Sequence, residues 1–444
     1  MSSVEIKPAG NGAFDAHHPP ARDIIDKCVH CGFCLPVCPT YVLWGEEMDS
    51  PRGRIYLMKR ASDGSAAMND EWVRHFDACL GCVACMTACP SGVDYGKLIE
   101  ATRAQIERRY RRPAIQRFLK TRLLRTLTRP GLLNALLWPM KLYQRSGLQA
   151  MARKTGLLDI LPQQMKAAEA LLPAIPSNSS VPELVPAQGE RRMRVGMLAG
   201  CVQRVFLPQV NAATARVLAA EGCDVITPAD QGCCGALLVH SGEEKEALEL
   251  ARRTIDVFEK AGVDAIVINA AGCGSSLKEY GHLLRDDPQY ADRARKFAAK
   301  CKDVAEILAE IGPRAQRRPL PLRVAYHDSC HLQHAQGIRT QPRKLLAQVP
   351  GLTLVELPEA AVCCGSAGIY NLVQPEAAAE LGDRKARFIA DTKADLVVTG
   401  NPGCLLQLRS ALARNGKPLP VIHTIQLLDA SLSGASIESL LAMG

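Results

Sequence analysis

The sequence predicts a multidomain α+β protein with a helical N-terminal domain, a helical linker and two repeated α/β domains. Three observations support this prediction. Two cysteine blocks of equal spacing lie near the N-terminus, a Leu- and Arg-rich segment follows them, and the rest of the chain repeats itself after about 130 residues. A chain of 444 residues is also too long for one ordinary hydrophobic core, so we expect two to four domains.

The composition is that of a globular protein without a membrane span. Hydrophobic residues make up 47% of the chain and charged residues 22%, and no apolar run approaches the roughly eighteen residues that cross a bilayer. Residues 1–20 lack the order of a secretory signal and are expected to form a flexible leader. In a protein that is not exported, the 18 cysteines are expected to stay reduced and to bind metal rather than form disulfides.

Residues 21–102 contain the two cysteine blocks. CVHCGFCLPVCP, which begins at Cys28, and CLGCVACMTACP, which begins at Cys79, both follow the C-x2-C-x2-C-x3-C-P run that holds 4Fe–4S clusters in bacterial ferredoxins. In two-cluster ferredoxins, the fourth cysteine of each run binds the other cluster. We therefore assign cluster 1 to Cys28, Cys31, Cys34 and Cys89, and cluster 2 to Cys79, Cys82, Cys85 and Cys38.

The prediction for this segment is thus an α-helical ferredoxin-like domain with two 4Fe–4S clusters. A pair of zinc knuckles is the alternative, but zinc sites usually join two short C-x2-C hairpins across a spacer. Between the blocks, Arg52 and Arg54 of the PRGR stretch are expected to offset part of the clusters' negative charge, unless they belong to a solvated turn.

Residues 103–172 form a basic segment with a helical pattern. From Arg103 to Lys154 there are fourteen Lys or Arg and one acid, Glu107, whereas the whole chain has a net charge of +9. Such a surface suits anionic lipid or an acidic partner, and a merely solvated helix face is the alternative. Aromatic residues are sparse and nucleic-acid-binding motifs are absent, so we expect no nucleic-acid partner. A Pro- and Ser-rich linker over 173–192 follows.

The internal repeat covers residues 193–312 and 322–440. Each copy begins with an apolar strand that ends near a cysteine, continues to Cys-Cys-Gly, and closes with a second apolar strand before Gly-Cys. The matching cysteines are Cys201, Cys233, Cys234 and Cys273 in the first copy, and Cys330, Cys363, Cys364 and Cys404 in the second. Because helix-like stretches alternate with the strands, we predict two similar α/β domains with their cysteines at strand ends.

The chemistry of these two four-cysteine sets stays open between a further iron–sulfur cluster, zinc or a structural thiol role, and thiol chemistry. Adjacent cysteines point apart, which strains a single tetrahedral zinc site, whereas a multi-iron cluster offers separate metal atoms. Outside the pattern, Cys223 and Cys301 are expected to fill apolar core. The histidines beside Cys330 are expected to face solvent or cap helices rather than bind metal: His327, His331 and His334.

The repeats resemble the cysteine-rich CCG domains of heterodisulfide reductases, of the lactate-utilisation proteins and of the iron–sulfur subunits of flavin dehydrogenases. That family pattern ends in C-x-x-C, and here Ala270 and Asn401 replace the first cysteine of the pair. In the reductases five cysteines hold a non-cubane cluster, so the replacement leaves such a cluster open in this chain.

As a whole, the chain resembles the iron–sulfur subunit of glycolate oxidase (glycolate dehydrogenase), through CVHCGFCLPVCPTY, DSPRGRIYLMK, GCGSSLKEYG and CCGSAGIY among other stretches. The resemblance implies an electron-transfer subunit, which passes electrons from FAD on a companion subunit through two 4Fe–4S clusters to quinone or another acceptor as glycolate becomes glyoxylate. The chain itself has no G-x-G-x-x-G between a strand and a helix, so we expect no dinucleotide site and no catalytic residue on it.

The resemblance also implies FAD-containing glycolate oxidase subunits as partners, and a cytoplasmic location, peripheral on the inner membrane. Three alternatives remain. The chain could serve a lactate or glycerol-3-phosphate dehydrogenase in the same way, it could be a heterodisulfide-reductase-like thiol enzyme, or it could be a zinc-holding scaffold. The thiol enzyme predicts five cysteines in each repeat, and these repeats have four.

Overall fold

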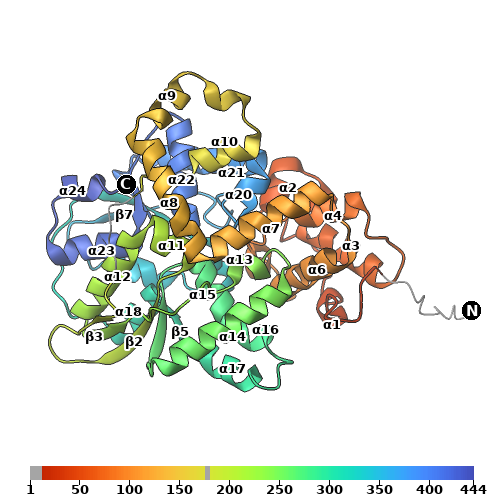
Figure 1. The fold of residues 1–444 in the computed structure, drawn as a ribbon, viewed down its shortest axis with the longest axis horizontal. Helices are drawn as coiled ribbons and strands as arrows, with labels where there is room; N and C mark the ends of the chain where they lie inside the picture. The colour runs from red at the N-terminus through yellow and green to blue at the C-terminus, as the bar shows by residue number, and fades with distance from the viewer. Residues whose placement is uncertain (1–12, 176–180) are drawn as a thin grey trace, which may run out of the picture.

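The computed structural model describes residues 13–175 and 181–444 (Figure 1). Residues 1–12 of the expected leader and residues 176–180 of the expected linker lie outside the described residues. The described chain is helical as far as Ala170, and it then alternates between strands and helices that build two sheets. The predicted fold class, α+β with two repeated α/β domains, is confirmed.

The N-terminal domain consists of short helices around the two cysteine blocks. They are α1 (Arg22–Ile25), α2 (Pro39–Trp44), η1 (Glu47–Asp49), α3 (Pro51–Ser62), α4 (Asp70–Asp77), α5 (Ala84–Thr87) and α6 (Tyr95–Arg109). Proline begins two of them: α2 starts at Pro39, directly after Cys38, and α3 starts at Pro51, where the Ser50 side chain accepts a hydrogen bond from the Gly53 amide at 3.0 Å. The core beneath the blocks contains Met58, Trp72, Phe76 and Leu98.

Residues 13–20, at the end of the expected leader, contact α6 and the first α/β domain. The Gln105 side chain donates to the carbonyl oxygen of His17 at 2.9 Å. Arg108 pairs with Asp15 at 2.9 Å and with Glu244 at 2.8 Å. These contacts tie this stretch of chain to two domains at once.

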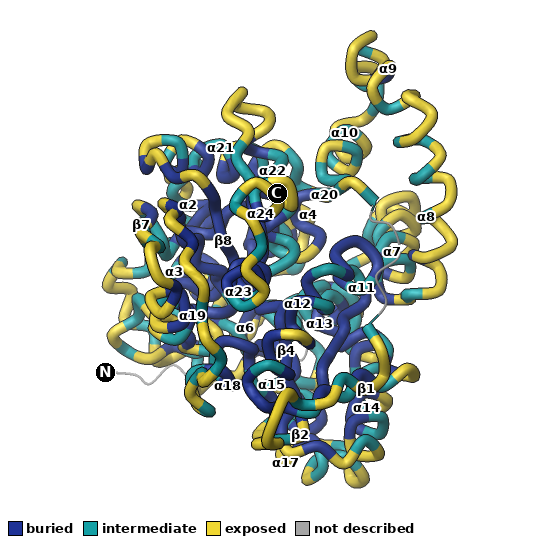
Figure 2. The backbone as a smooth tube through the Cα atoms, turned by 90° about the vertical axis from the view of Figure 1, so that its left-hand side faces the viewer, coloured by how far each residue is buried: buried dark blue, intermediate teal, exposed yellow. Residues whose placement is uncertain are grey.

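Residues 113–172, which we call the arm, form helices on one side of the molecule. They are α7 (Ala114–Thr128), α8 (Pro130–Arg145), α9 (Leu148–Lys154), η2 (Leu157–Ile160) and α10 (Gln163–Ala170). In Figure 2 much of α8 and α9 is yellow, because their residues are exposed, whereas α11 beside them is mostly buried. Among the described residues, none of the helices combines the length and the apolar character that a membrane span needs.

The first α/β domain contains a five-stranded sheet in the order β1-β3-β2-β4-β5. Its strands are β1 (Leu184–Val185), β2 (Met193–Leu198), β3 (Cys223–Ile226), β4 (Ala265–Ile268) and β5 (Cys301–Asp303). All neighbours are parallel except β1, which pairs with β3 in the antiparallel direction. Every residue of β4 is buried, as expected for a parallel strand covered on both faces. The helices are α11 (Cys201–Phe206), α12 (Pro208–Ala220), α13 (Ala236–Val239), α14 (Glu244–Lys260), α15 (Ala271–Lys278), α16 (Tyr280–Leu283), α17 (Ala291–Lys300) and α18 (Val304–Ile311).

The second α/β domain repeats this order without the short edge strand, as β7-β6-β8-β9, and all its pairs are parallel. Its strands are β6 (Arg323–His327), β7 (Thr353–Glu356), β8 (Leu396–Thr399) and β9 (Val421–His423). The helices are η3 (His331–Ala335, a π-helix), α19 (Thr340–Leu346), α20 (Tyr370–Val373), α21 (Pro375–Asp391), α22 (Pro402–Arg414), α23 (Thr424–Ser433) and α24 (Ile437–Leu441).

The two α/β domains share one hydrophobic core. Helix α12 of the first packs on α23 of the second, and Arg216 pairs with Asp429 at 2.6 Å at the edge of this contact. Buried residues of both domains, Val210 and Leu218 with Ile425 and Leu428 among them, belong to one continuous cluster. The cysteine-bearing strand ends of the two domains are therefore held in a fixed relation.

Candidate metal centres

The cluster-1 site lies at the surface of the N-terminal domain, in the loop before α2. It consists of Cys28, Cys31, Cys34 and Cys89, which line one cavity. The loop turns tightly because Gly32 (φ +87°) and His30 (φ 54°) adopt the left-handed region. All 18 cysteines lie among the described residues, and Cys31 is the only exposed one. Burial raises the pKa of Cys34 to about 11, so a bound cation is needed to hold this group as a thiolate at neutral pH.

The cluster-2 site adjoins the first and is buried. It consists of Cys38, Cys79, Cys82 and Cys85. Burial, followed by the charges of the other three sulfurs, raises the pKa of Cys85 well above its usual value. Cys85 also lines the cavity of the cluster-1 site. The structure thus brings Cys89 to the first cysteine block and Cys38 to the second, as the crossed assignment requires, and four converging thiols fit an iron–sulfur cluster.

Arg54 lies in the protein interior beside the cluster-2 site and is 1% exposed. Its Nε donates to the carbonyl oxygen of His75 at 2.6 Å, and its Nη atoms donate to Thr40 Oγ1 at 3.2 Å and to Asp49 Oδ1 at 3.3 Å. Thr40 Oγ1 in turn lies 3.3 Å from Cys38 Sγ. The solvated turn considered for this residue is therefore wrong, and its buried charge faces the cysteines.

Arg52, two residues earlier on α3, has a different environment. It lies at the rim of the cluster-1 site, where its guanidinium pairs with Glu47 at 2.7 Å. Its side chain is 27% exposed, so solvent screens its charge. At the cluster-2 site, by contrast, burial opposes the ionisation of Cys79 but the Arg54 charge lowers the pKa of this thiol below its usual value.

The first CCG site lies at the carboxyl ends of β2 and β4. It consists of Cys201, Cys233, Cys234 and Cys273. The sulfurs of Cys233 and Cys201 are 3.3 Å apart. Hydrogen bonds from the thiols of Cys233 and Cys273 lower the pKa of Cys234 well below its usual value. The four predicted cysteines therefore converge, three of them buried and Cys273 partly buried.

The second CCG site repeats this arrangement at the ends of β6 and β8. It consists of Cys330, Cys363, Cys364 and Cys404, all of them buried. Asn401 stands where the family pattern has a cysteine, and its Nδ2 donates to Cys404 Sγ at 3.4 Å while its Oδ1 accepts from the Gly272 amide at 3.4 Å. The side-chain amide thus takes the place of a thiol and links the two CCG sites. Ala270, at the equivalent position of the first domain, has no group that can do this.

The glycine of each Cys-Cys-Gly is required by the backbone. Gly235 and Gly365 have φ angles of +79° and +90°, which L side chains rarely adopt. A Cβ atom at Gly365 would lie 2.6 Å from the carbonyl oxygen of Ala378 on α21, and one at Gly235 would lie 3.4 Å from the same atom of Ala247 on α14. The turn after the two cysteines therefore packs directly against a helix backbone.

The second CCG site touches the cluster-2 site. Cys82, Cys330 and Cys363 belong to one buried cluster, and burial followed by the charge of Cys363 raises the pKa of Cys82 well above its usual value. Nearby, Thr87 Oγ1 and His334 Nδ1 are hydrogen-bonded at 2.6 Å across the same boundary. Three of the four sites are therefore contiguous, from the surface at Cys31 to the second α/β domain.

Contrary to our expectation, the histidines near Cys330 do not face solvent. His327 and His334 are buried, and burial lowers the pKa of His327 to about 3 while its Nδ1 lies 3.1 Å from Thr399 Oγ1. The ring of His331 lies 5.0 Å from that of His240 in the first domain. These side chains fill the space between the cysteine sites. The sequence could not predict this role, because the residues around a histidine do not show whether its side chain is buried.

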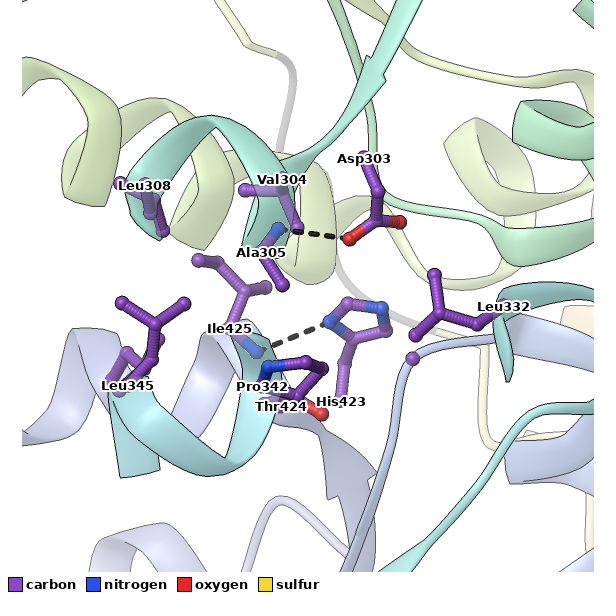
Figure 3. Close-up of a pocket in the computed structure, with 12 residues that line it drawn as sticks. Asp303, Val304, Ala305, Leu308, Leu332, Pro342, Leu345, His423, Thr424 and Ile425 are labelled. Atoms are coloured by element: carbon purple, nitrogen blue, oxygen red, sulfur yellow. Dashed lines mark hydrogen bonds between the residues drawn. The ribbon is translucent and has the colours of Figure 1, made fainter. Parts of the chain in front are cut away.

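A small pocket between the two α/β domains contains a buried acid and a buried base (Figure 3). Asp303 and His423 end the corresponding strands β5 and β9, and each caps the next helix. Asp303 Oδ1 accepts from the Ala305 amide at 2.8 Å, and His423 Nδ1 accepts from the Ile425 amide at 3.2 Å. Burial raises the pKa of Asp303 to about 7 and lowers the pKa of His423 to about 4.

Three protein families match separate segments of the chain. The cysteine-rich domain matches residues 195–278 and 324–409, and the 4Fe–4S dicluster domain matches residues 24–93. Residues 115–172, which make up most of the arm, match the linker region of the glycolate oxidase iron–sulfur subunit. All the cysteines that we predicted as ligands lie within the matches to the first two families.

Two curated relatives are similar over almost their whole length. The chain is 40% identical over 416 residues to the probable glycolate oxidase iron–sulfur subunit of Bacillus subtilis, which covers 92% of this chain and 94% of that protein. It is 37% identical over 417 residues to the glycolate oxidase iron–sulfur subunit of Escherichia coli, with coverage of 93% and 95%. Lactate utilization protein A of Oceanobacillus iheyensis is 32% identical over 243 residues, which make up 54% of this chain and 99% of that protein.

Proposed function

Since the chain belongs to the family of glycolate oxidase iron–sulfur subunits, we propose that it is the electron-transfer subunit of an FAD-dependent glycolate dehydrogenase. In this proposal glycolate is oxidised to glyoxylate at FAD on a companion subunit, and this chain contributes no catalytic residue. Each oxidation releases two electrons, which leave the flavin singly for quinone or another acceptor. When bound, two 4Fe–4S clusters supply the one-electron centres that this requires.

The chain's own part is to hold these centres and to set their surroundings. The proposed ligands are Cys28, Cys31, Cys34 and Cys89 for cluster 1, and Cys38, Cys79, Cys82 and Cys85 for cluster 2. Each set takes three cysteines from one block and one from the other. Substitution of a single cysteine is therefore expected to destabilise both cysteine blocks of the domain.

The observation that carries the proposal is the serial order of the cysteine sites. One end is open at Cys31, the cluster-2 site lies behind it, and the second CCG site meets the cluster-2 site at Cys82 and Cys363. Contiguous buried sites with one exposed end suit the transfer of charge through a protein. We include in the proposal a redox-active metal centre at the second CCG site, while iron–sulfur and zinc remain alternatives for the first.

The proposed contact with the flavin subunit is the exposed rim of the cluster-1 site. Val29 and Phe33 in this loop are 68% and 66% exposed. Tyr56 of α3, also exposed, lies edge-to-face with His30 at a ring separation of 6.5 Å. Apolar and aromatic side chains around a redox centre suit the small interfaces of electron-transfer partners.

Two finer parts of the proposal concern the acceptor and the substrate. We propose a quinone acceptor with peripheral attachment of the complex to the inner membrane. A lactate-oxidising partner is the second candidate, because lactate utilization proteins A match about half of the chain. The family match of residues 115–172 supports glycolate instead.

The test is anaerobic purification of the chain together with its flavin subunits. We expect a brown complex with about eight or more iron atoms and equal acid-labile sulfide, whose paramagnetic iron signals develop when glycolate is added. Lactate and glycerol 3-phosphate serve as comparison substrates. A colourless zinc protein, or iron centres that neither glycolate nor dithionite reduces, would contradict the proposal.

A further inference from the structure

The arm displays most of the large apolar side chains that the described structure leaves exposed. Twelve of the nineteen lie between residues 115 and 165. They are Ile115, Phe118, Leu119, Leu132, Leu136, Trp138, Leu142, Leu148, Met151, Leu157, Ile160 and Met165. Monomeric proteins rarely expose apolar residues in such density, so this surface is expected to have a partner.

Helix α8 shows the feature most clearly, because it is apolar on two opposite sides. Leu133, Leu137 and Met140 pack against the core shared by the α/β domains. On the side of the helix opposite to these residues, Trp138 and Leu142 are 72% and 52% exposed. Leu132 and Leu136, which are 44% and 40% exposed, lie between this outer side and the side that faces the core. A helix with apolar residues all round is normally buried. The outer side of α8 is thus an unpartnered apolar face.

The arm carries a large excess of positive charge. Residues 113–172 contain ten Lys or Arg and only two acids, Asp159 and Glu169, and the second of these pairs with Arg153 at 2.9 Å. Seven cations have no carboxylate within ion-pair distance in the part of the chain that the structure describes: Arg117, Arg122, Arg125, Arg129, Lys141, Arg145 and Lys154. A partner for this surface must therefore be both apolar and anionic.

We propose that the arm binds the surface of an anionic lipid bilayer, with the outer side chains of α8 among the lipid headgroups and the arginines of α7 on anionic phosphates. The combination of Lys and Arg with Trp, Phe and Leu on exposed helices is typical of helices that lie in the membrane interface. The inference deepens the proposed peripheral attachment and rests on the proposed function for its purpose, the delivery of electrons to a membrane acceptor.

The position of the arm separates it from the proposed flavin contact. The flavin subunit must reach the cluster-1 site, whose rim belongs to the loop before α2. In Figure 1, α9 and α10 lie at the top of the molecule near α21 and α22 and α8 runs down from them, whereas α3 lies at the right of the molecule and α1 at the lower right. Figure 2 likewise shows α8 to α10 projecting on the side away from α3. Both surfaces can therefore be occupied at the same time.

The experiment is sedimentation of the anaerobically purified complex with vesicles of phosphatidylglycerol or of phosphatidylcholine. We expect binding to the anionic vesicles that weakens with rising salt, because exposed charges are screened. Trp138→Gln/Leu142→Gln and Arg122→Gln/Arg125→Gln/Arg129→Gln are each expected to weaken this binding by at least about tenfold, since each cation near an anionic surface contributes to attachment. The fluorescence of Trp138 should shift to the blue on binding in a Trp44→Phe background.

Matched controls remove equal numbers of exposed groups elsewhere. Arg60→Gln/Lys344→Gln/Lys417→Gln removes three cations and Leu184→Gln/Val373→Gln removes two apolar groups outside the arm. Vesicle binding that these controls reduce equally, or that is the same for both lipids, would overturn the inference. So would arm variants that lose the flavin subunit while keeping vesicle binding. The paramagnetic iron signals of the same samples report on the proposed function separately, because surface substitutions leave the cysteine sites intact.

Discussion

Arg54 and Arg52 lie two residues apart on α3, and they predict different effects on the two clusters. Arg54 is fully buried beside Cys38 and Cys79, whereas Arg52 is partly exposed beside the cluster-1 site. A buried positive charge stabilises the more negative, reduced form of a cluster, and it does so more strongly at low dielectric. We expect Arg54→Gln to lower the midpoint potential of cluster 2 and Arg52→Gln to cause a smaller change at cluster 1.

The measurement is a redox titration followed by the paramagnetic signals of both clusters. Arg54→Lys keeps the charge and serves as the conservative variant, so it should retain most of the wild-type potential. Equal shifts in Arg54→Gln and Arg52→Gln would show that the burial of Arg54 does not strengthen the effect of its charge. No shift in either variant would show that Arg54 acts only through its hydrogen bonds to Thr40, Asp49 and the His75 carbonyl.

Asp303 predicts a pH dependence of stability. Burial raises its pKa from 3.8 to about 7, so the folded state favours the neutral carboxyl. The stability that the neutral Asp303 carboxyl contributes is fully present below about pH 4 and is lost as the pH rises through 7. In this range Asp303 ionises freely in the unfolded chain, whereas in the folded chain burial opposes its ionisation. Asp303→Asn keeps an acceptor for the Ala305 amide and cannot ionise. We therefore expect it to stabilise the protein at pH 8, by up to about 4 kcal/mol.

Thermal unfolding of the two proteins under anaerobic conditions at pH 5 and pH 8 provides the check. The variant should exceed the wild type in melting temperature at pH 8, and the difference should shrink at pH 5. A difference that is the same at both pH values would mean that Asp303 does not titrate in this range.

The structural roles of Asp303, His423 and Asn401 could not be predicted from the sequence. The ligand cysteines could be identified because their spacing is a local pattern that one loop imposes. The burial of Asp303 and His423 depends on the packing of two domains against each other, which no local pattern records. Asn401 could be seen to replace a cysteine, but its bond to Cys404 and to the first domain is visible only in the fold.

At the level of elements, the turn after each Cys-Cys pair offers a matched comparison between the repeats. Gly235 and Gly365 both have positive φ angles, but only at Gly365 would a Cβ lie within 3 Å of a helix backbone. Gly235→Ala is expected to destabilise the protein by about 1 kcal/mol through the strained backbone. Gly365→Ala adds overpacking against α21, which brings the expected loss to roughly 2–4 kcal/mol.

Melting temperatures and metal content of the two variants test this difference. Gly365→Ala should unfold at the lower temperature and should lose metal from the second α/β domain, if that domain binds metal, while the N-terminal clusters remain. If both substitutions lower the melting temperature equally, α21 moves aside at little cost and the close contact is not a constraint.

Elements could be predicted better than their contacts. The alternation of apolar strands and helices predicted two α/β domains, and both sheets have the expected cysteines at their strand ends. The two-residue strand β1 was not expected, because it lies in the predicted linker, outside the repeat, and has too few residues to show a pattern; it pairs with β3 of the first repeat. The exposed outer side of α8 was also not foreseen, since helical periodicity cannot tell which of two apolar sides meets the core.

At the scale of the whole molecule, the contact between the cluster-2 site and the second CCG site gives the two repeats different environments. Sequence similarity makes the repeats equivalent, and nothing in their spacing says which of them the ferredoxin-like domain meets. In the fold, Cys82 lies with Cys330 and Cys363 of the second repeat. No cysteine of the first CCG site belongs to this buried cluster. The first repeat instead meets the cluster-2 block through Arg103, which donates to the carbonyl oxygens of His240 and of Cys79.

This asymmetry predicts unequal effects of two equivalent substitutions. Cys363→Ser should stop the glycolate-dependent reduction of a quinone analogue while the paramagnetic signals of the N-terminal clusters still develop with glycolate, because the series of sites is interrupted after the cluster-2 site. Cys233→Ser, at the matching position of the first repeat, should leave quinone reduction largely intact. Quinone reduction and the paramagnetic signals are both measured on variant complexes that retain their flavin subunits and the wild-type melting temperature. Normal quinone reduction in Cys363→Ser would assign the second CCG site a structural role, and equal losses in both variants would mean that the two repeats act together.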